Sequence, residues 1–141
     1  MSESVDYLRD IEYKDTCPFV YPIHYGKVIK VYDGDTITIA AKLPNTDGPI
    51  YRFSVRLNGI DTPEIRGQSK AEKDLAIVVR DALSDLIMGK IVELRNVANE
   101  KYGRILADVY FDNMSINDWL IEQDFAVPYD GGKKMRPANW D

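Results

Sequence analysis

The chain has 141 residues, of which 45% are hydrophobic, and a formal net charge of -5 at pH 7. This length and apolar content fit a single domain with its own core, and no apolar run approaches the length of a membrane-spanning helix. With one histidine (His24) and one cysteine (Cys17), the chain cannot supply the ligands of a zinc site or an internal disulfide framework.

The first 24 residues are polar and interrupted by prolines, and we expect them to form an N-terminal arm lying on a domain that spans residues 25–130. This arm lacks the basic and apolar regions of a secretory signal. The missing signal features and the single cysteine favour an intracellular enzyme, or a viral enzyme that acts inside a host cell. Five acids against Arg9 and Lys14 give residues 1–15 a net charge of -3, so the rest of the chain is near neutral.

Three strand-like runs follow the arm, at about residues 26–32, 36–43 and 50–57. The first two are joined by an Asp-Gly segment typical of a hairpin turn. Taken alone, this segment is most simply a turn, in which Asp33 caps the backbone.

The third run ends in a rigid corner. Its apolar and polar side chains alternate as in a half-buried strand, so Arg56 is expected to point away from the apolar face. Gly59 allows the chain to bend, and Pro63 stiffens the segment that follows. Three oxygen-bearing groups lie on this corner: Asp61, the carbonyl of Thr62, and Glu64.

A helix is predicted next, because Ser69 and Glu72 have the spacing of a capping box and Gly89 is placed to end the helix. Two further strand-like runs follow, at about residues 90–97 and 104–111. The predicted apolar stripe of the helix consists of Leu75, Val78, Val79, Ala82, Leu83, Leu86 and Ile87.

Five short strands with a helix between the third and the fourth predict a mainly β, α+β fold. The arrangement is a five-stranded OB-fold barrel capped by two to three helices. A second helix is expected near residues 115–123, with Ile116, Trp119 and Leu120 facing inward. Residues 131–141 are expected to form a C-terminal tail whose end, around Trp140, is frayed.

The motifs combine oxygen ligands with fixed positive charge. Glu64 is a carboxylate able to take a proton from water, and Arg56 and Arg104 suit the geometry of a phosphate. A hard cation such as Ca²⁺ or Mg²⁺ accepts the oxygen ligands Asp35, Asp61 and the Thr62 carbonyl. This combination suggests phosphodiester hydrolysis.

Three stretches, in this order, carry a family resemblance: VIKVYDGDTITI, RLNGIDTPEIRG and KYGRILADVY. From about Gly26 to Tyr129 the chain resembles the staphylococcal nuclease (thermonuclease) family. The resemblance implies the same barrel, a Ca²⁺ cofactor, and hydrolysis of DNA and RNA that leaves 3′-phosphate products. The tyrosines Tyr102 and Tyr129, which lie near basic residues in the sequence, favour single-stranded substrates.

The resemblance also implies roles for residues that match the family's motifs. The implied metal ligands are Asp35, Asp61 and Thr62; the catalytic residues are Arg56, Glu64 and Arg104; the substrate-binding residues are Lys101, Tyr102 and Tyr129. The match is looser for Tyr129, for which a ring packed on the barrel fits equally well.

Two other functions stay open at this point. A noncatalytic OB-type module for nucleic-acid binding or scaffolding would share the fold, and a phosphodiesterase acting on a small nucleotide would share the site. The net charge of -5 is unusual for a protein that binds a polyanion. We therefore expect nucleic acid to bind with modest, salt-sensitive affinity. We also expect the protein to be a monomer without membrane contact.

Overall fold

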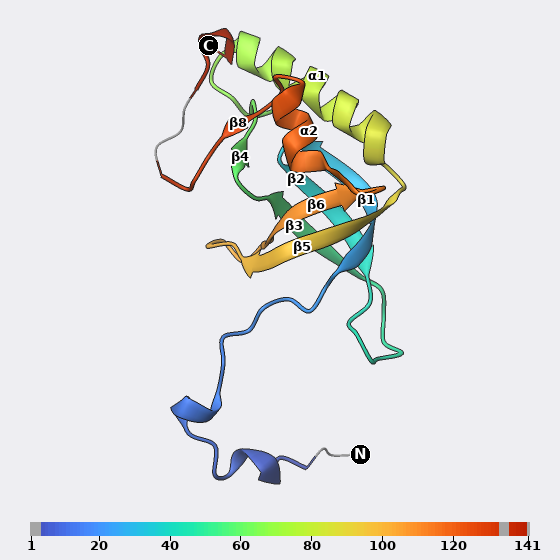
Figure 1. The fold of residues 1–141 in the computed structure, drawn as a ribbon, viewed down its shortest axis with the longest axis vertical. Coiled ribbons are helices and arrows are strands. Elements are labelled where there is room, and N and C mark those ends of the chain that lie inside the picture. Colours follow the sequence, from blue (N-terminus) through green and yellow to red (C-terminus); the bar gives the residue numbers. More distant parts are fainter. Residues whose placement is uncertain (1–3, 133–135, 141) are drawn as a thin grey trace.

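A computed structural model describes residues 4–132 and 136–140, and Figure 1 shows a small β-barrel with α1 lying across one end. The barrel strands follow the order β3-β2-β1-β5-β6 with antiparallel neighbours, and a parallel pairing of β3 with β6 closes the barrel. The strands are β1 (Tyr25–Asp33), β2 (Thr36–Ala41), β3 (Tyr51–Leu57), β5 (Ile91–Asn99) and β6 (Ile105–Phe111). The predicted α+β fold with a five-stranded OB-like barrel is confirmed.

The two predicted helices are present as α1 (Lys70–Ile87) and α2 (Ile116–Glu122). Short 3₁₀ turns are also present at Asp6–Leu8, Tyr13–Asp15 and Ala138–Trp140. Three two-residue strands complete the fold: β4 (Ile60–Asp61), β7 (Met114–Ser115) and β8 (Val127–Pro128). These short elements escaped prediction because two or three residues carry no hydrophobic period.

One core joins the barrel to both helices. Val79, Leu83 and Ile87 of α1 are fully buried, as predicted. Val78 was wrongly assigned to the buried stripe, because it is 54% exposed and Ala76 is buried in its place. One helical residue corresponds to a rotation of roughly 100°, so Val78 lies off the face that Val79 presents to the barrel.

The β1–β2 hairpin turn contains Gly34 and Asp35, and Gly34 is required there by close packing. Neither residue has a positive φ, so the turn is not of the primed type that an Asp-Gly hairpin favours. A Cβ on Gly34 would lie 2.6 Å from Cγ1 of Val79 and 2.9 Å from Cγ2 of Thr62. The glycine therefore lets the turn lie against α1 and against the corner that follows β3.

The N-terminal arm extends away from the barrel for most of its length, as Figure 1 shows, and residues 4–20 are exposed. Contact begins near Phe19, whose carbonyl accepts a hydrogen bond from Asn99, and continues at Ile23, which is buried. The expectation that the whole arm lies on the domain was wrong. Between residues 5 and 15, charged residues are interspersed with the apolar ones, so this part of the arm has no continuous apolar face to bury. Within the described residues, no helix is long and apolar enough to cross a membrane.

The C-terminal segment of the chain packs beside the start of α1. Trp140 was expected at a frayed end, but only 1% of its surface is exposed, and its carbonyl accepts a hydrogen bond of 3.1 Å from the Ser69 hydroxyl. Burying a large aromatic ring beside the start of α1 outweighs the tendency of a chain end to fray. We call Arg136 to Trp140 the C-terminal clamp.

The predicted capping box at the start of α1 is only half formed. The Ser69 hydroxyl accepts a hydrogen bond of 3.0 Å from the backbone N–H of Glu72. The Glu72 carboxylate instead accepts hydrogen bonds from the Arg136 guanidinium, at 2.6 and 3.2 Å, and from the backbone N–H of Glu64, at 3.0 Å. Glu72 thus connects the C-terminal clamp to the corner that carries Glu64.

The clamp can be tested by replacing Trp140 with alanine. Because the ring is buried, Trp140→Ala should lower the free energy of unfolding by about 3–5 kcal/mol in urea titrations followed by circular dichroism. Tyr13→Ala is the control, since Tyr13 is 95% exposed, and it should change stability by less than about 0.5 kcal/mol. Equal effects of the two substitutions would contradict the burial of Trp140.

The Glu72 contacts predict a pH-dependent stability. Its hydrogen bond with Arg136 holds the pKa of Glu72 below its ordinary value of 4.5. The carboxylate therefore stabilises the fold fully above that value, and this contribution is lost as pH falls through the lowered pKa. At pH 7, Glu72→Gln should cost about 1.5–3 kcal/mol.

Thermal unfolding of the wild type and Glu72→Gln between pH 7 and pH 3 measures this effect. The difference in Tm should shrink below about pH 4.5, because the wild-type carboxyl then becomes neutral as well. Replacing the exposed Glu122 with glutamine provides a control. A difference in Tm that stays constant down to pH 3 would exclude the charged contact.

Candidate active site

A cavity of about 480 Å³ lies where the β1–β2 turn, the end of β3 and the start of β6 meet. Five of the predicted site residues line this cavity, which we call the acidic cavity: Asp35, Arg56, Asp61, Glu64 and Arg104. Thr62 is 1% exposed and lies behind them, with its backbone N–H 3.3 Å from Oδ2 of Asp35. The structure therefore brings together residues that are up to 69 positions apart in the sequence.

A second cavity of about 490 Å³ contains the predicted substrate-binding residues Lys101, Tyr102 and Tyr129. We call it the tyrosine cavity. Arg56 and Arg104 line both cavities, so the two arginines lie between them. Tyr129 is half-buried, and its backbone N–H donates to the Gly59 carbonyl at 2.8 Å, which keeps the tyrosine beside the bend after β3.

Two buried carboxylates face one guanidinium group. Asp35 and Asp61 are 6% and 2% exposed, and Nη2 of Arg56 lies 3.6 Å from Oδ2 of Asp35 and 3.9 Å from Oδ1 of Asp61. Arg56 also donates to the carbonyls of Leu57, at 2.6 Å, and Ile60, at 2.8 Å. These backbone contacts fix the guanidinium at the end of β3, beside both carboxylates.

Arg104 is oriented by Glu100, a residue that the sequence did not single out. Nε and Nη2 of Arg104 donate to the two Glu100 oxygens at 3.1 and 2.9 Å, and its Nη1 donates to the Thr36 hydroxyl at 3.3 Å. These hydrogen bonds lower the pKa of Glu100 and raise that of Arg104. The available signal was an acid four positions before an arginine, across a turn centred on Gly103.

Glu64 reaches the acidic cavity from the corner, and its backbone is held by Glu72. Pro63 restricts the residue before it, and the Glu64 carbonyl accepts from the N–H of Gly67 at 2.9 Å. The role of Glu72 as an anchor was missed, because its spacing from Ser69 indicated a helix cap. Only the fold reveals that the same carboxylate binds the corner.

Asp33 is a buried acid at the edge of the site. Burial, reinforced by the nearby charge of Asp35, raises the pKa of Asp33 to about 8, so that its carboxyl holds a proton at neutral pH. Its Oδ1 accepts from the backbone N–H of Asp35 at 3.2 Å, which confirms the predicted capping of the turn. A divalent cation bound at Asp35 would favour the charged form of Asp33.

The side chains at this site suit a hard cation. Within the described residues, no group of three or more His, Cys, Asp or Glu side chains is arranged around a common point. The expected ligand set does not require such a group, because it combines the carboxylates of Asp35 and Asp61 with the backbone carbonyl of Thr62. Two buried carboxylates within 4 Å of one guanidinium nitrogen are chemically compatible with Ca²⁺ or Mg²⁺ completed by water and substrate oxygens.

The chain is similar to several nuclease-like proteins. It is 34% identical over 103 residues to a protein named "Uncharacterized endonuclease" from Haemophilus influenzae, across 73% of this chain and 51% of that protein. An Escherichia coli protein of the same name is 30% identical over 107 residues, across 75% and 61%. "Staphylococcal-like nuclease CAN1" of Arabidopsis thaliana is 27% identical over 93 residues, across 64% and 26%.

The chain thus spans about half to three fifths of the length of the two bacterial relatives. A family model described as "Staphylococcal nuclease homologue" matches residues 54–138, which include the corner after β3, α1 and the segment containing Arg104. Since this match covers more than half of the 141 residues, the chain belongs to the staphylococcal nuclease homologue family.

Proposed function

We propose that this protein is a Ca²⁺-dependent nuclease that hydrolyses phosphodiester bonds in single-stranded DNA and RNA and leaves 3′-phosphate products. The observation that carries the proposal is the convergence, in one cavity, of Glu64 with two buried carboxylates and two arginines. The tyrosine cavity on the other side of the arginines offers aromatic surface for a base. Family membership and the names of the relatives support the same reaction class.

In the proposed mechanism, Glu64 accepts a proton from the water that attacks phosphorus in line with the departing oxygen. Glu72 holds the Glu64 backbone, so the base does not have to be ordered when substrate arrives. Asp35, Asp61 and the Thr62 carbonyl would bind Ca²⁺, which when bound offsets negative charge on the phosphoryl oxygens.

The two arginines have different surroundings. Arg104 is turned toward the site by its double contact with Glu100, so its position is set before substrate binds. The side chain of Arg56 is 13% exposed, and it balances the carboxylates while facing both cavities. Both are proposed to stabilise the charge that develops on the reacting phosphate.

Replacing Glu64 with glutamine tests the proposed base. Glu64→Gln should lower kcat for a single-stranded oligonucleotide by about 10²- to 10⁴-fold, because the proton acceptor is lost. Binding, measured by fluorescence anisotropy, should change little. Glu122→Gln, at an exposed site on α2, is the control and should cut at the wild-type rate. Undiminished cleavage by Glu64→Gln would exclude this role.

Calcium binding can be measured without any activity assay. Ca²⁺ at about 100 times its Kd should stabilise the wild type by about 2.7 kcal/mol, seen as a rise in Tm. The Ca²⁺-induced rise should disappear in Asp35→Asn and Asp61→Asn, and it should persist in Asp85→Asn, which alters an exposed carboxylate of α1. A rise that survives both site substitutions would place the ion elsewhere.

A further inference from the structure

We propose that the outer face of β1, β2 and β3 forms a second nucleotide subsite, in which Lys30 binds a phosphate beyond the reacting one and Tyr32 stacks on a base. The substrate class would then be a strand several nucleotides long that is bound on both sides of the cut, rather than a small phosphodiester. This inference rests on the proposed nuclease function.

The first support is the position of the two cavities. They share Arg56 and Arg104, so a strand whose reacting phosphate lies at the arginines can extend into both. One direction leads to Tyr102 and Tyr129. The other leads across the acidic cavity to Lys30, Tyr32, Thr38 and Ser54, and none of these four belongs to the proposed catalytic or metal-binding set.

The strand register makes this second direction a continuous surface. Thr36 pairs with Arg56, and in the next row Thr38 pairs with both Ser54 and Lys30. Alternate residues of a strand share a face, so these side chains lie on the outer side of the barrel. Thr38 and Ser54 lie between Lys30 and Arg56 on this face. Their short, hydroxyl-bearing side chains leave room for a sugar-phosphate backbone to pass.

The charges on this face are suited to phosphate. In a chain of net charge -5, this face carries Lys30 on β1 and Arg52 on β3, and neither has an ion pair among the described residues. Arg104, by contrast, is paired with Glu100. A cation without a carboxylate partner attracts a phosphate without first breaking an ion pair.

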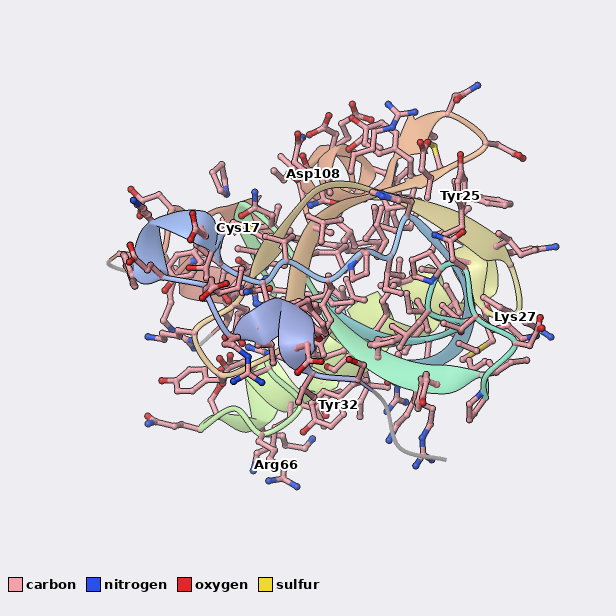
Figure 2. The ribbon with its side chains drawn as sticks, turned by 90° about the horizontal axis from the view of Figure 1, so that it is seen from below. Cys17, Tyr25, Lys27, Tyr32, Arg66 and Asp108 are labelled. Atoms are coloured by element: carbon pink, nitrogen blue, oxygen red, sulfur yellow. The ribbon has the colours of Figure 1, made fainter. Side chains whose placement is uncertain are left out.

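Tyr32 gives the subsite an aromatic surface. It is 39% exposed, and Nζ of Lys30 lies 5.9 Å from the centre of its ring. Figure 2 shows Tyr32 on the same side of the molecule as Arg66, and both line the acidic cavity. An aromatic ring beside a cation is a common arrangement for binding single-stranded nucleic acid without sequence preference.

The spacing is compatible with a neighbouring phosphate. Lys30 and Arg56 lie two strands apart and are offset by two residues along the strands. At about 4.8 Å per strand and about 3.3 Å per residue, their Cα atoms are separated by roughly 12 Å. A long lysine side chain can bridge part of this distance toward the next phosphate of an extended strand. A dinucleotide, with its single phosphate at the arginines, has no further phosphate to offer Lys30.

Substrates of two lengths test the subsite. The wild type, Lys30→Gln, Tyr32→Ala and the control Lys90→Gln are compared, with Ca²⁺ present, on a thymidine dinucleotide and a 12-nucleotide oligothymidylate. Lys90 is an exposed lysine between α1 and β5. Lys30→Gln and Tyr32→Ala should each lower kcat/KM by about 5- to 50-fold more on the 12-mer than on the dinucleotide. Lys30→Gln should also reduce, by about one, the slope of the logarithm of the 12-mer binding constant against the logarithm of salt concentration.

Equal losses on both substrates, or a Lys30→Gln protein that behaves like Lys90→Gln, would overturn the subsite. The anisotropy of a labelled 12-mer is also measured in the Glu64→Gln background, where cleavage does not interfere. If the wild type cuts neither substrate, the proposed nuclease function fails. Weaker 12-mer binding after Lys30→Gln would still support the subsite in that case, and unchanged binding would reject it.

Discussion

The parallel pairing of β3 with β6 closes the barrel and brings the two site arginines together. Val55 lies opposite Ile105, and Arg56 lies opposite Leu106, two positions beyond Arg104. The buried partners in this pairing hold the strands in register, because a slip of one residue would turn apolar side chains outward. Core packing therefore sets the position of the arginines between the two cavities.

A second constraint is the cost of burying carboxylates. Asp35 and Asp61 are almost fully buried and face a common guanidinium, while Asp33 avoids a further buried charge by keeping its proton. Glu72 is buried with a salt bridge to Arg136. Each acid is accommodated by a specific contact or by a change of protonation.

The C-terminal clamp links the stability of the fold to the geometry of the site. Arg136 binds Glu72, and Glu72 binds the backbone of Glu64, so the packing of Trp140 against α1 supports the corner that carries the proposed base. This connection runs through residues that are 64 positions apart. Loss of the clamp is therefore expected to affect both stability and the position of Glu64.

Sequence patterns predicted what depends on local periodicity and turn chemistry. The barrel strands, both helices and the bend at Gly59, whose φ is +78°, follow from alternation, helical spacing and glycine placement. The same patterns failed where the outcome depends on distant partners. Helical spacing alone could not distinguish Val78 from the buried stripe, and end position alone made Trp140 a frayed residue.

Local motifs were sufficient to predict the fold class, the family and the set of candidate site residues, because each motif carries its own chemistry in a short stretch of chain. The folded barrel was needed to show which of these residues share a cavity and which acids hold them in place. Glu100 and Glu72 orient Arg104 and the corner through contacts that depend on barrel closure and on the return of the chain to α1. Such contacts form only when packing brings separate segments together, so no local pattern encodes them.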